Sequence, residues 1–279
     1  MTENKRDAYA SLRIDAFRNF QFSRFMLTFA VQMAETIIAW KIYQITHDKL
    51  VLGLLGLSEA LPFILTSLYS GHAADIFNRY KIARTTIVAI TLCFATVGLL
   101  MSGHAPLLQK YGAQPIYLVI GVSGIARGFM APAFQSIFPQ LIPRELSSNA
   151  ATWGSNTWQT AAVLGPAMGG LLYGFTNVET SFTIVVIMMA ISFLLFLRVP
   201  MKATPPKEKV ETLYESLTAG LRFVFGKQEM LSAISLDLFA VLFGGAVALL
   251  PVFASDILHV GPQGLGILRA APFFGSVIM

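Results

Sequence analysis

Charged residues are scarce in this sequence. Only 13% of its 279 residues are charged and 55% are hydrophobic, whereas about a quarter of the residues in a soluble domain carry a charge. A soluble fold of this length could not bury so much apolar surface. The composition therefore predicts a membrane protein.

Cysteine and catalytic motifs are equally scarce. The single cysteine, Cys93, has no partner for an internal disulfide and lies in an apolar run, where it is interpreted as a packing residue. The sequence contains no P-loop, no dinucleotide-binding glycine fingerprint, no metal-spaced His/Cys/carboxylate cluster and no nucleophile elbow. These absences predict no enzyme activity, no cofactor, no metal and no nucleotide partner.

Apolar runs of membrane-spanning length recur along nearly the whole chain. A helix needs about 20 residues to cross about 30 Å of hydrocarbon, so the runs predict an all-α polytopic membrane protein. They lie near residues 22–45, 51–71, 84–103, 115–139, 152–175, 180–198 and 230–255, and an eighth begins near 262. Because that last run stops at Met279 without a polar or basic flank, we expect the sequence to be truncated within the eighth helix.

Basic residues concentrate in alternate loops. With the N-terminus in the cytoplasm, the outer loops hold only Lys49 and Lys110. The inner segments hold Lys5, Arg6, Arg13, Arg18, Arg79, Lys81, Arg84, Arg144, Arg198, Lys202, Lys207, Lys209, Arg222 and Lys227. This bias predicts a multi-pass protein of the cell (inner) membrane with a cytoplasmic N-terminus. The net charge of +5 is spread over every inner turn, which indicates contact with anionic lipid rather than with nucleic acid.

The one long inner segment covers residues 199–228. It opens with two prolines and continues with apolar residues at helical spacing, a pattern typical of an interfacial amphipathic helix. It divides the chain into a six-helix transmembrane bundle (1–198), a cytoplasmic linker with an amphipathic helix (199–228) and the start of a C-terminal bundle, helix 7 and part of helix 8 (229–279).

A few ionisable residues lie inside the apolar runs: Glu35, Glu59, Arg127 and Asp237. A charge at the bilayer centre costs about 3 kcal/mol, so such a residue suggests a function. Gln32 lies one turn before Glu35 on the same helical face. We expect these five residues to line a substrate cavity and to carry proton coupling. A structural pair of Glu35 with Arg127 is the alternative, and Glu59 and Asp237 also fit polar packing groups.

The turn after the second run carries the first sign of a known family. Gly71, Asp75 and Arg79 stand at the spacing of the signature loop of the major facilitator superfamily, which this turn resembles. The resemblance implies a conformational latch: Gly71 permits close helix approach, Asp75 caps the next helix or pairs across the bundle, and Arg79 supplies a cation.

The fifth run contains a second family element. Its Gly165, Pro166, Gly169 and Gly170 are similar to the Gly-Pro-x-x-Gly-Gly element of superfamily antiporters. Such a helix can act as a hinge or a seal, because the glycines let backbones touch and the proline removes a hydrogen-bond donor. Ordinary small-residue packing, with Gly174 as a further member, is the alternative.

Two further segments extend the resemblance. Arg127 within 124–128 resembles the buried arginine that superfamily antiporters use in proton transfer, and the stretches 249–253 and 264–272 are similar to the seventh and eighth helices of the multidrug and siderophore (enterobactin-type) exporter branch. The resemblance implies a secondary active transporter that exports hydrophobic or amphiphilic small molecules in exchange for protons, by rocking of two six-helix bundles.

The expected partners are a small-molecule substrate, protons and the lipid bilayer, and neither nucleic acid nor nucleotide. Two alternatives stay open at this point. An uptake symporter would move its substrate in the opposite direction under an imposed pH gradient. A non-transporting, truncated membrane protein would serve as a sensor or partner scaffold.

Overall fold

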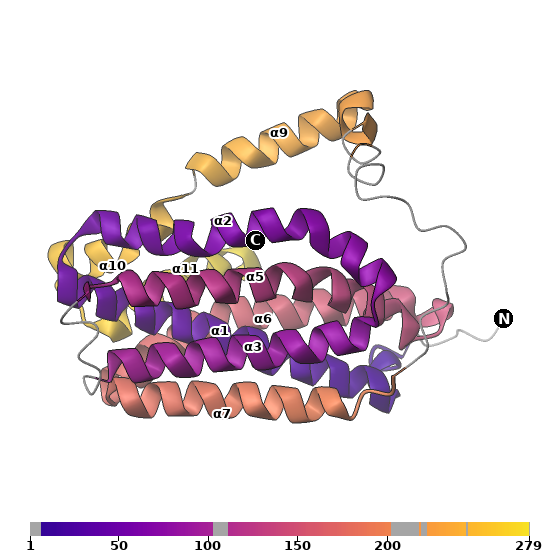
Figure 1. The fold of residues 1–279 in the computed structure, drawn as a ribbon, viewed down its shortest axis with the longest axis horizontal. Helices are drawn as coiled ribbons and strands as arrows, with labels where there is room; N and C mark the ends of the chain where they lie inside the picture. The colour runs from indigo at the N-terminus through magenta and orange to yellow at the C-terminus, as the bar shows by residue number, and fades with distance from the viewer. Residues whose placement is uncertain (1–6, 103–110, 202–217, 219–221, 244, 279) are drawn as a thin grey trace.

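The computed structural model describes residues 7–102, 111–201, 218, 222–243 and 245–278. All regular elements in this part of the chain are helical, as the sequence predicts. The long helices run roughly alongside one another (Figure 1). They are α1 (Asp15–Thr46), α2 (Lys49–Ile76), α3 (Arg79–Met101), α5 (Gln114–Ile137), α6 (Ser147–Phe175) and α7 (Val178–Leu197).

Five of the described helices are long and apolar enough to cross a membrane: α1, α2, α3, α5 with the turn that follows it, and α7. The protein is therefore a multi-pass, all-α membrane protein. The helix α6, of 29 residues, is not among these five. It lies against α1 on one side and α11 (Pro262–Ile278) on another.

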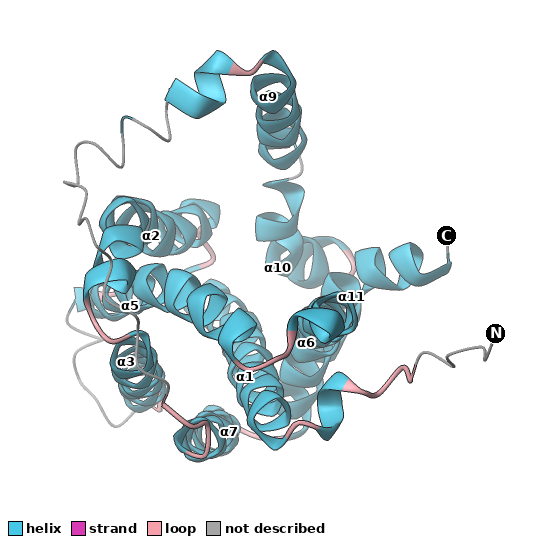
Figure 2. Cartoon of the chain, turned by 90° about the vertical axis from the view of Figure 1, so that its right-hand side faces the viewer, coloured by secondary structure: helices cyan, strands magenta, loops and turns pink. Residues whose placement is uncertain are grey.

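The hydrophobic core lies between α1, α3, α5 and α7 (Figure 2). Phe20 of α1 is fully buried, and its ring lies 5.3 Å from that of Phe134 in α5. The Phe134 ring in turn stacks on Phe196 of α7 at a centroid distance of 5.7 Å. These aromatic contacts hold three helices together at the end of the bundle where α1 begins.

Short polar side chains fix where several helices begin. Asp48 accepts a hydrogen bond from the Leu50 amide of α2 at 2.8 Å, and Asn177 accepts one from the Thr180 amide of α7 at 2.8 Å. Each cap satisfies an amide that has no partner within its helix. Long helices that follow one another along the chain run in opposite directions, whereas the packed pair α2 and α5 runs in the same direction.

The second group of elements is more broken than the sequence predicts. The expected single helix over 230–255 is divided in the structure: α9 (Gln228–Phe243) is followed by the 3-10 helix η4 (Gly245–Leu249), the short α-helix α10 (Leu250–Val252) and the π-helix η5 (Phe253–Ile257). Gly245 and Pro251 fall in this stretch, and both residue types disfavour an uninterrupted helix. Helix α9 stands apart from the long helices (Figures 1 and 2). Most of the expected linker helix, 202–217 and 219–221, lies outside the described residues.

Candidate functional site

Three charged side chains from three helices meet in the middle of the bundle. Nη1 of Arg127 in α5 lies 2.7 Å from Oε1 of Glu35 in α1, and the same nitrogen contacts Oε1 of Glu59 in α2. The three side chains are 31%, 28% and 25% exposed, respectively. One guanidinium therefore bridges two half-buried carboxylates, and we name this set the charge triad.

Two glycines of α5 explain how Arg127 comes so close to α2. A Cβ atom at Gly124 would overlap the backbone carbonyl of Glu59. One at Gly128 would lie 3.0 Å from Cβ of Thr66. Because neither position has a side chain, the two backbones approach closely and the guanidinium reaches Glu59 directly.

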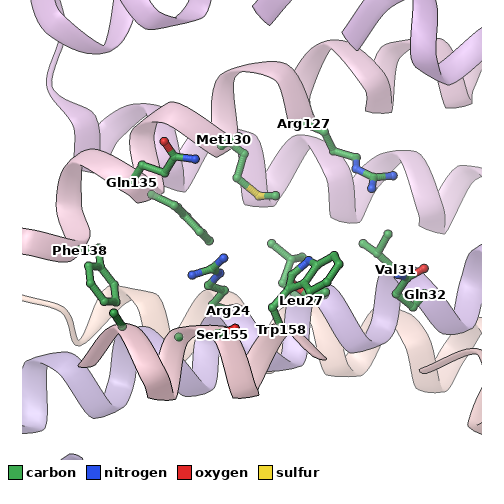
Figure 3. Close-up of a pocket in the computed structure, with 15 residues that line it drawn as sticks. Arg24, Leu27, Val31, Gln32, Arg127, Met130, Gln135, Phe138, Ser155 and Trp158 are labelled. Atoms are coloured by element: carbon green, nitrogen blue, oxygen red, sulfur yellow. The ribbon is translucent and has the colours of Figure 1, made fainter. Parts of the chain in front are cut away.

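The charge triad separates two cavities. The larger cavity has a volume of about 620 Å³ and lies between α1, α5 and α6, with Gln32 and Arg127 at the end nearest the charge triad (Figure 3). The smaller cavity has a volume of about 160 Å³, and Glu35 and Glu59 are part of its lining. The arginine of the triad thus faces one cavity and the two carboxylates face the other.

The walls of the larger cavity combine apolar and polar side chains. Arg24 reaches into its centre (Figure 3). Its apolar lining includes Met130, Phe134, Phe138 and Trp158, and its polar lining includes Thr28, Gln135 and Ser155. A cavity of this volume lies within the range that is typical of small-molecule sites.

A second arginine approaches the triad from α11. Arg269 lines the smaller cavity together with Glu35 and Glu59, and its Nη1 donates a hydrogen bond to Oγ1 of Thr36 at 3.2 Å. Its Nε is buried without a hydrogen-bond partner among the described residues. Arg269 thus brings positive charge to the Glu35 side of the bundle from an element outside the six long helices.

The C-terminal end of α1 is covered by the elements that follow α9. The hydroxyl of Tyr43 donates a hydrogen bond to Oδ2 of Asp256 in η5. Trp40 packs against Ala254 and Leu265 in a small apolar cluster. These contacts join the C-terminal half of α1 to the second group of elements.

The glycines of α6 face two different helices. A Cβ at Gly165 would lie 2.6 Å from Cβ of Gln32, and one at Gly169 would lie 2.6 Å from the carbonyl oxygen of Met33, so both face α1. A Cβ at Gly170 would overlap the carbonyl oxygen of Pro262 and lie 2.8 Å from Cα of Gly266 in α11. Close approach to two helices is what a sealing helix requires. Pro166 sits between these contacts and α6 stays helical across it.

The structure describes only part of the predicted latch of Gly71, Asp75 and Arg79. Within the described structure, a Cβ at Gly71 would meet nothing within 4 Å, so no helix approaches it here. The side chain of Asp75 lies outside the described residues. Arg79 donates from Nε to the carbonyl of Ala74 at 3.1 Å, at the end of α2. The N-cap of α3 is Asn78, which accepts from the amides of Tyr80 and Lys81, and not Asp75. The alternative that Asp75 pairs across the bundle stays a prediction.

The structure does not bring Asp237 to the charge triad. Asp237 is an exposed residue of α9, and α9 stands away from the long helices (Figure 1). The sequence placed it near the inner end of one continuous seventh span, and the break after α9 removes that premise. Glu35, Glu59, Arg127 and Gln32 are the predicted cavity residues that the structure places together.

Two arginines were missed by the sequence reasoning. Arg24 and Arg269 lie within apolar runs and were not assigned a role. A signal for Arg24 does exist, since Arg24, Thr28, Gln32 and Glu35 follow one another at helical spacing on α1. Such a polar stripe on an otherwise apolar helix marks the face that borders a cavity. Among the described residues, no group of three or more His, Cys, Asp or Glu side chains is placed to hold a metal ion.

Comparison with known proteins gives the family. The model of the family described as "Transmembrane secretion effector" matches residues 6–279. The chain belongs to this family. It is 24% identical over 185 residues to the staphyloferrin A transporter of Staphylococcus aureus, which covers 65% of this chain and 45% of the relative. It is 24% identical over 257 residues to YkuC of Bacillus subtilis, an uncharacterised transporter of the major facilitator type, which covers 86% of this chain and 58% of that relative.

A third relative, the uncharacterised major facilitator type transporter YfmI of Bacillus subtilis, is 23% identical over 181 residues. The chain spans about half the length of these curated relatives. The family and its relatives are transporters and not enzymes. The membrane helices and the family together assign this chain to the major facilitator transporters.

Proposed function

We propose that the protein acts as a secondary active transporter that exports an amphiphilic small molecule across the cell (inner) membrane in exchange for protons. The observation that carries this proposal is the charge triad between two cavities. An ionisable group inside a membrane bundle costs free energy, so its presence suggests a pathway for protons or substrate. The transporter relatives support the same class of function.

The predicted orientation of the chain assigns each cavity to one half of the membrane. With a cytoplasmic N-terminus, Arg24 near the start of α1 and Ser155 near the start of α6 fall in the inner half of the membrane. The larger cavity then receives substrate from the cytoplasm. The smaller cavity falls in the outer half, beneath the contact of Tyr43 with Asp256. This arrangement suits the loading state of an exporter.

Proton coupling follows from the charges around Glu35. The charge triad contains two carboxylates and one guanidinium, so it carries a net negative charge that Arg269 offsets from α11. When the second bundle rocks, α11 and its arginine move relative to α1. A carboxylate left without a counter-charge in a region of low dielectric constant binds a proton. Proton binding and bundle movement are thereby linked.

The test is transport by the purified chain in proteoliposomes that present the predicted cytoplasmic face outward. The probes are two dyes that share a xanthene core, carboxyfluorescein, an anion, and rhodamine 123, a cation. An acidic lumen is expected to drive at least one dye inward, whereas an uptake symporter would need an alkaline lumen. We expect Glu35→Gln to reduce transport to the level of protein-free vesicles, and Arg269→Gln to allow proton leakage without dye movement.

The matched control is Asp15→Asn, which removes a carboxylate from the same helix at a position where the side chain is 79% exposed. It is expected to transport at the rate of the unmodified protein. Equal transport by Glu35→Gln and Asp15→Asn, at equal protein in the vesicles, would remove Glu35 from the mechanism. Absence of gradient-driven movement of either dye by the unmodified protein would count against transport by this chain.

A further inference from the structure

The larger cavity contains positive charge but no acidic side chain among its lining residues. Its two charged residues are Arg24 from α1 and Arg127 from α5. The remaining lining residues are neutral: Leu27, Thr28, Val31, Gln32, Met130, Ala131, Phe134, Gln135, Phe138, Ala151, Gly154, Ser155 and Trp158. The charged groups that a solute meets in this cavity are therefore all positive.

The two arginines are not equivalent. The guanidinium of Arg127 is already bound to Glu35 and Glu59. Arg24 makes no ion pair or side-chain hydrogen bond with any residue that the structure describes, and Figure 3 shows its guanidinium between the two walls of the cavity. The uncompensated charge of the larger cavity is therefore that of Arg24.

Other arginines at the same end of α1 show how a cation is ordinarily balanced. Arg18 pairs with Asp15 at 2.6 Å and Arg13 pairs with Asp7 at 3.0 Å, and both pairs are exposed to solvent. Arg24 lies deeper, where water competes less and an unpaired charge costs more. Of these three arginines of the N-terminal region, the least exposed one is thus the one without a counter-ion among the described residues.

The surroundings of Arg24 define the rest of the ligand. Met130, Phe134 and Trp158 offer apolar and aromatic surface, while Thr28 and Ser155 offer hydroxyl groups. The volume of about 620 Å³ falls within the range of about 300 to 1,000 Å³ that is typical of sites for small organic molecules. A ligand that fits has an apolar body and one acidic group.

We propose that the exported molecule is an amphiphilic organic anion whose carboxylate or other acidic group binds the guanidinium of Arg24. The planar guanidinium can donate two parallel hydrogen bonds to such a group, and this geometry favours a carboxylate over a neutral oxygen. The proposal rests on the proposed transport function, since it names the substrate class of that cavity. It assigns a role in substrate recognition to Arg24 and leaves proton coupling to the charge triad.

The test measures binding rather than transport. Fluorescence anisotropy of carboxyfluorescein and of rhodamine 123 is recorded with the purified chain in detergent, without any gradient. Carboxyfluorescein is expected to bind more tightly than rhodamine 123. Arg24→Gln is expected to weaken carboxyfluorescein about tenfold, the usual scale for one hydrogen bond to a charged group, and Arg24→Lys by less. The control Arg18→Gln removes the same charge from an exposed position of α1 and should change neither affinity.

Thermal unfolding of each variant shows whether the helices still assemble. Equal or tighter binding of rhodamine 123, absence of carboxyfluorescein binding, or binding that Arg24→Gln leaves unchanged in a folded protein would overturn the proposal. Loss of bound carboxyfluorescein on addition of phosphatidylglycerol would assign the site to a lipid headgroup and would also overturn it. Carboxyfluorescein binding that depends on Arg24, without gradient-driven transport, would support the anion site and count against the proposed transport function.

Discussion

The two cavities on either side of the charge triad differ in how their charges are balanced. In the smaller cavity two carboxylates face arginines from α5 and α11, and the surrounding contacts join α1 to the second group of elements. In the larger cavity Arg24 stands among neutral side chains. Paired charges satisfy one another within the protein, whereas an unpaired charge in a cavity can bind a solute of opposite charge.

Helix packing follows the same division. Where the second group of elements meets the long helices, glycine contacts join α6 to α11 and an apolar cluster forms at Trp40. Around the larger cavity, bulky side chains such as Phe138 and Trp158 stand apart with space between them. The contact of α6 with α11 thus depends on glycines, whereas the walls of the larger cavity carry large side chains.

The largest effect on this comparison is expected from Gly170→Ala. The added methyl group would meet the backbone of α11 at Pro262 and Gly266, so α6 and α11 must separate. Such overpacking typically costs about 1 to 3 kcal/mol. Gly53→Ala is the matched control, because a Cβ at Gly53 meets nothing within 4 Å in the described structure. It should cost no stability.

Thermal unfolding of the two variants in the same detergent checks this prediction. A lower melting temperature for Gly170→Ala than for Gly53→Ala is the expected result. Equal melting temperatures would mean that the contact of α6 with α11 does not contribute to the stability of the protein.

A smaller effect is expected from Tyr43→Phe. This substitution removes the hydroxyl that donates to Asp256 and keeps the aromatic ring. The loss is about 1 kcal/mol, the usual net value of one such hydrogen bond. Tyr117→Phe is the control, since that hydroxyl donates to the Val51 carbonyl at 3.2 Å and links α5 to α2 within the six long helices.

The rate of cysteine labelling in the smaller cavity measures the effect of Tyr43→Phe on access to that cavity. A cysteine-reactive reagent added from the outside should modify Gly56→Cys, which lines the smaller cavity, faster when Tyr43→Phe is present. The Tyr117→Phe background should leave that rate unchanged. Identical rates in both backgrounds would show that the contact of Tyr43 with Asp256 does not hold the smaller cavity closed.

Much of the fold follows from the sequence, because apolar runs and short polar turns are local signals. Helix ends are less well predicted. Arg18 interrupts the apolar run before the first span, yet α1 begins at Asp15 and Phe17 is fully buried. Tertiary packing extends the helix beyond Arg18, although the hydropathy pattern places the start of the span after that charge. The break after α9 was missed for the opposite reason, since its glycines and proline lie in an apolar stretch.

The candidate site could be predicted only where each residue is unusual by itself. Glu35, Glu59 and Arg127 stand out as charges in apolar runs, but the sequence does not reveal that one guanidinium contacts both carboxylates. The position of Arg269 near the charge triad could be seen only in the folded structure, because its neighbour Thr36 is far away in the sequence. The latch residues Gly71, Asp75 and Arg79 and the hinge glycines keep the roles that the resemblance implies as predictions.

The central proposal is that the larger cavity opens to the cytoplasm. It is tested most directly with a membrane-impermeant maleimide and the variant Ser155→Cys in a Cys93→Ser background. Ser155 lines the larger cavity, and Cys93 is itself buried. The account predicts rapid labelling of Ser155→Cys in inside-out vesicles and little labelling in right-side-out vesicles. Faster labelling from the outside would contradict it.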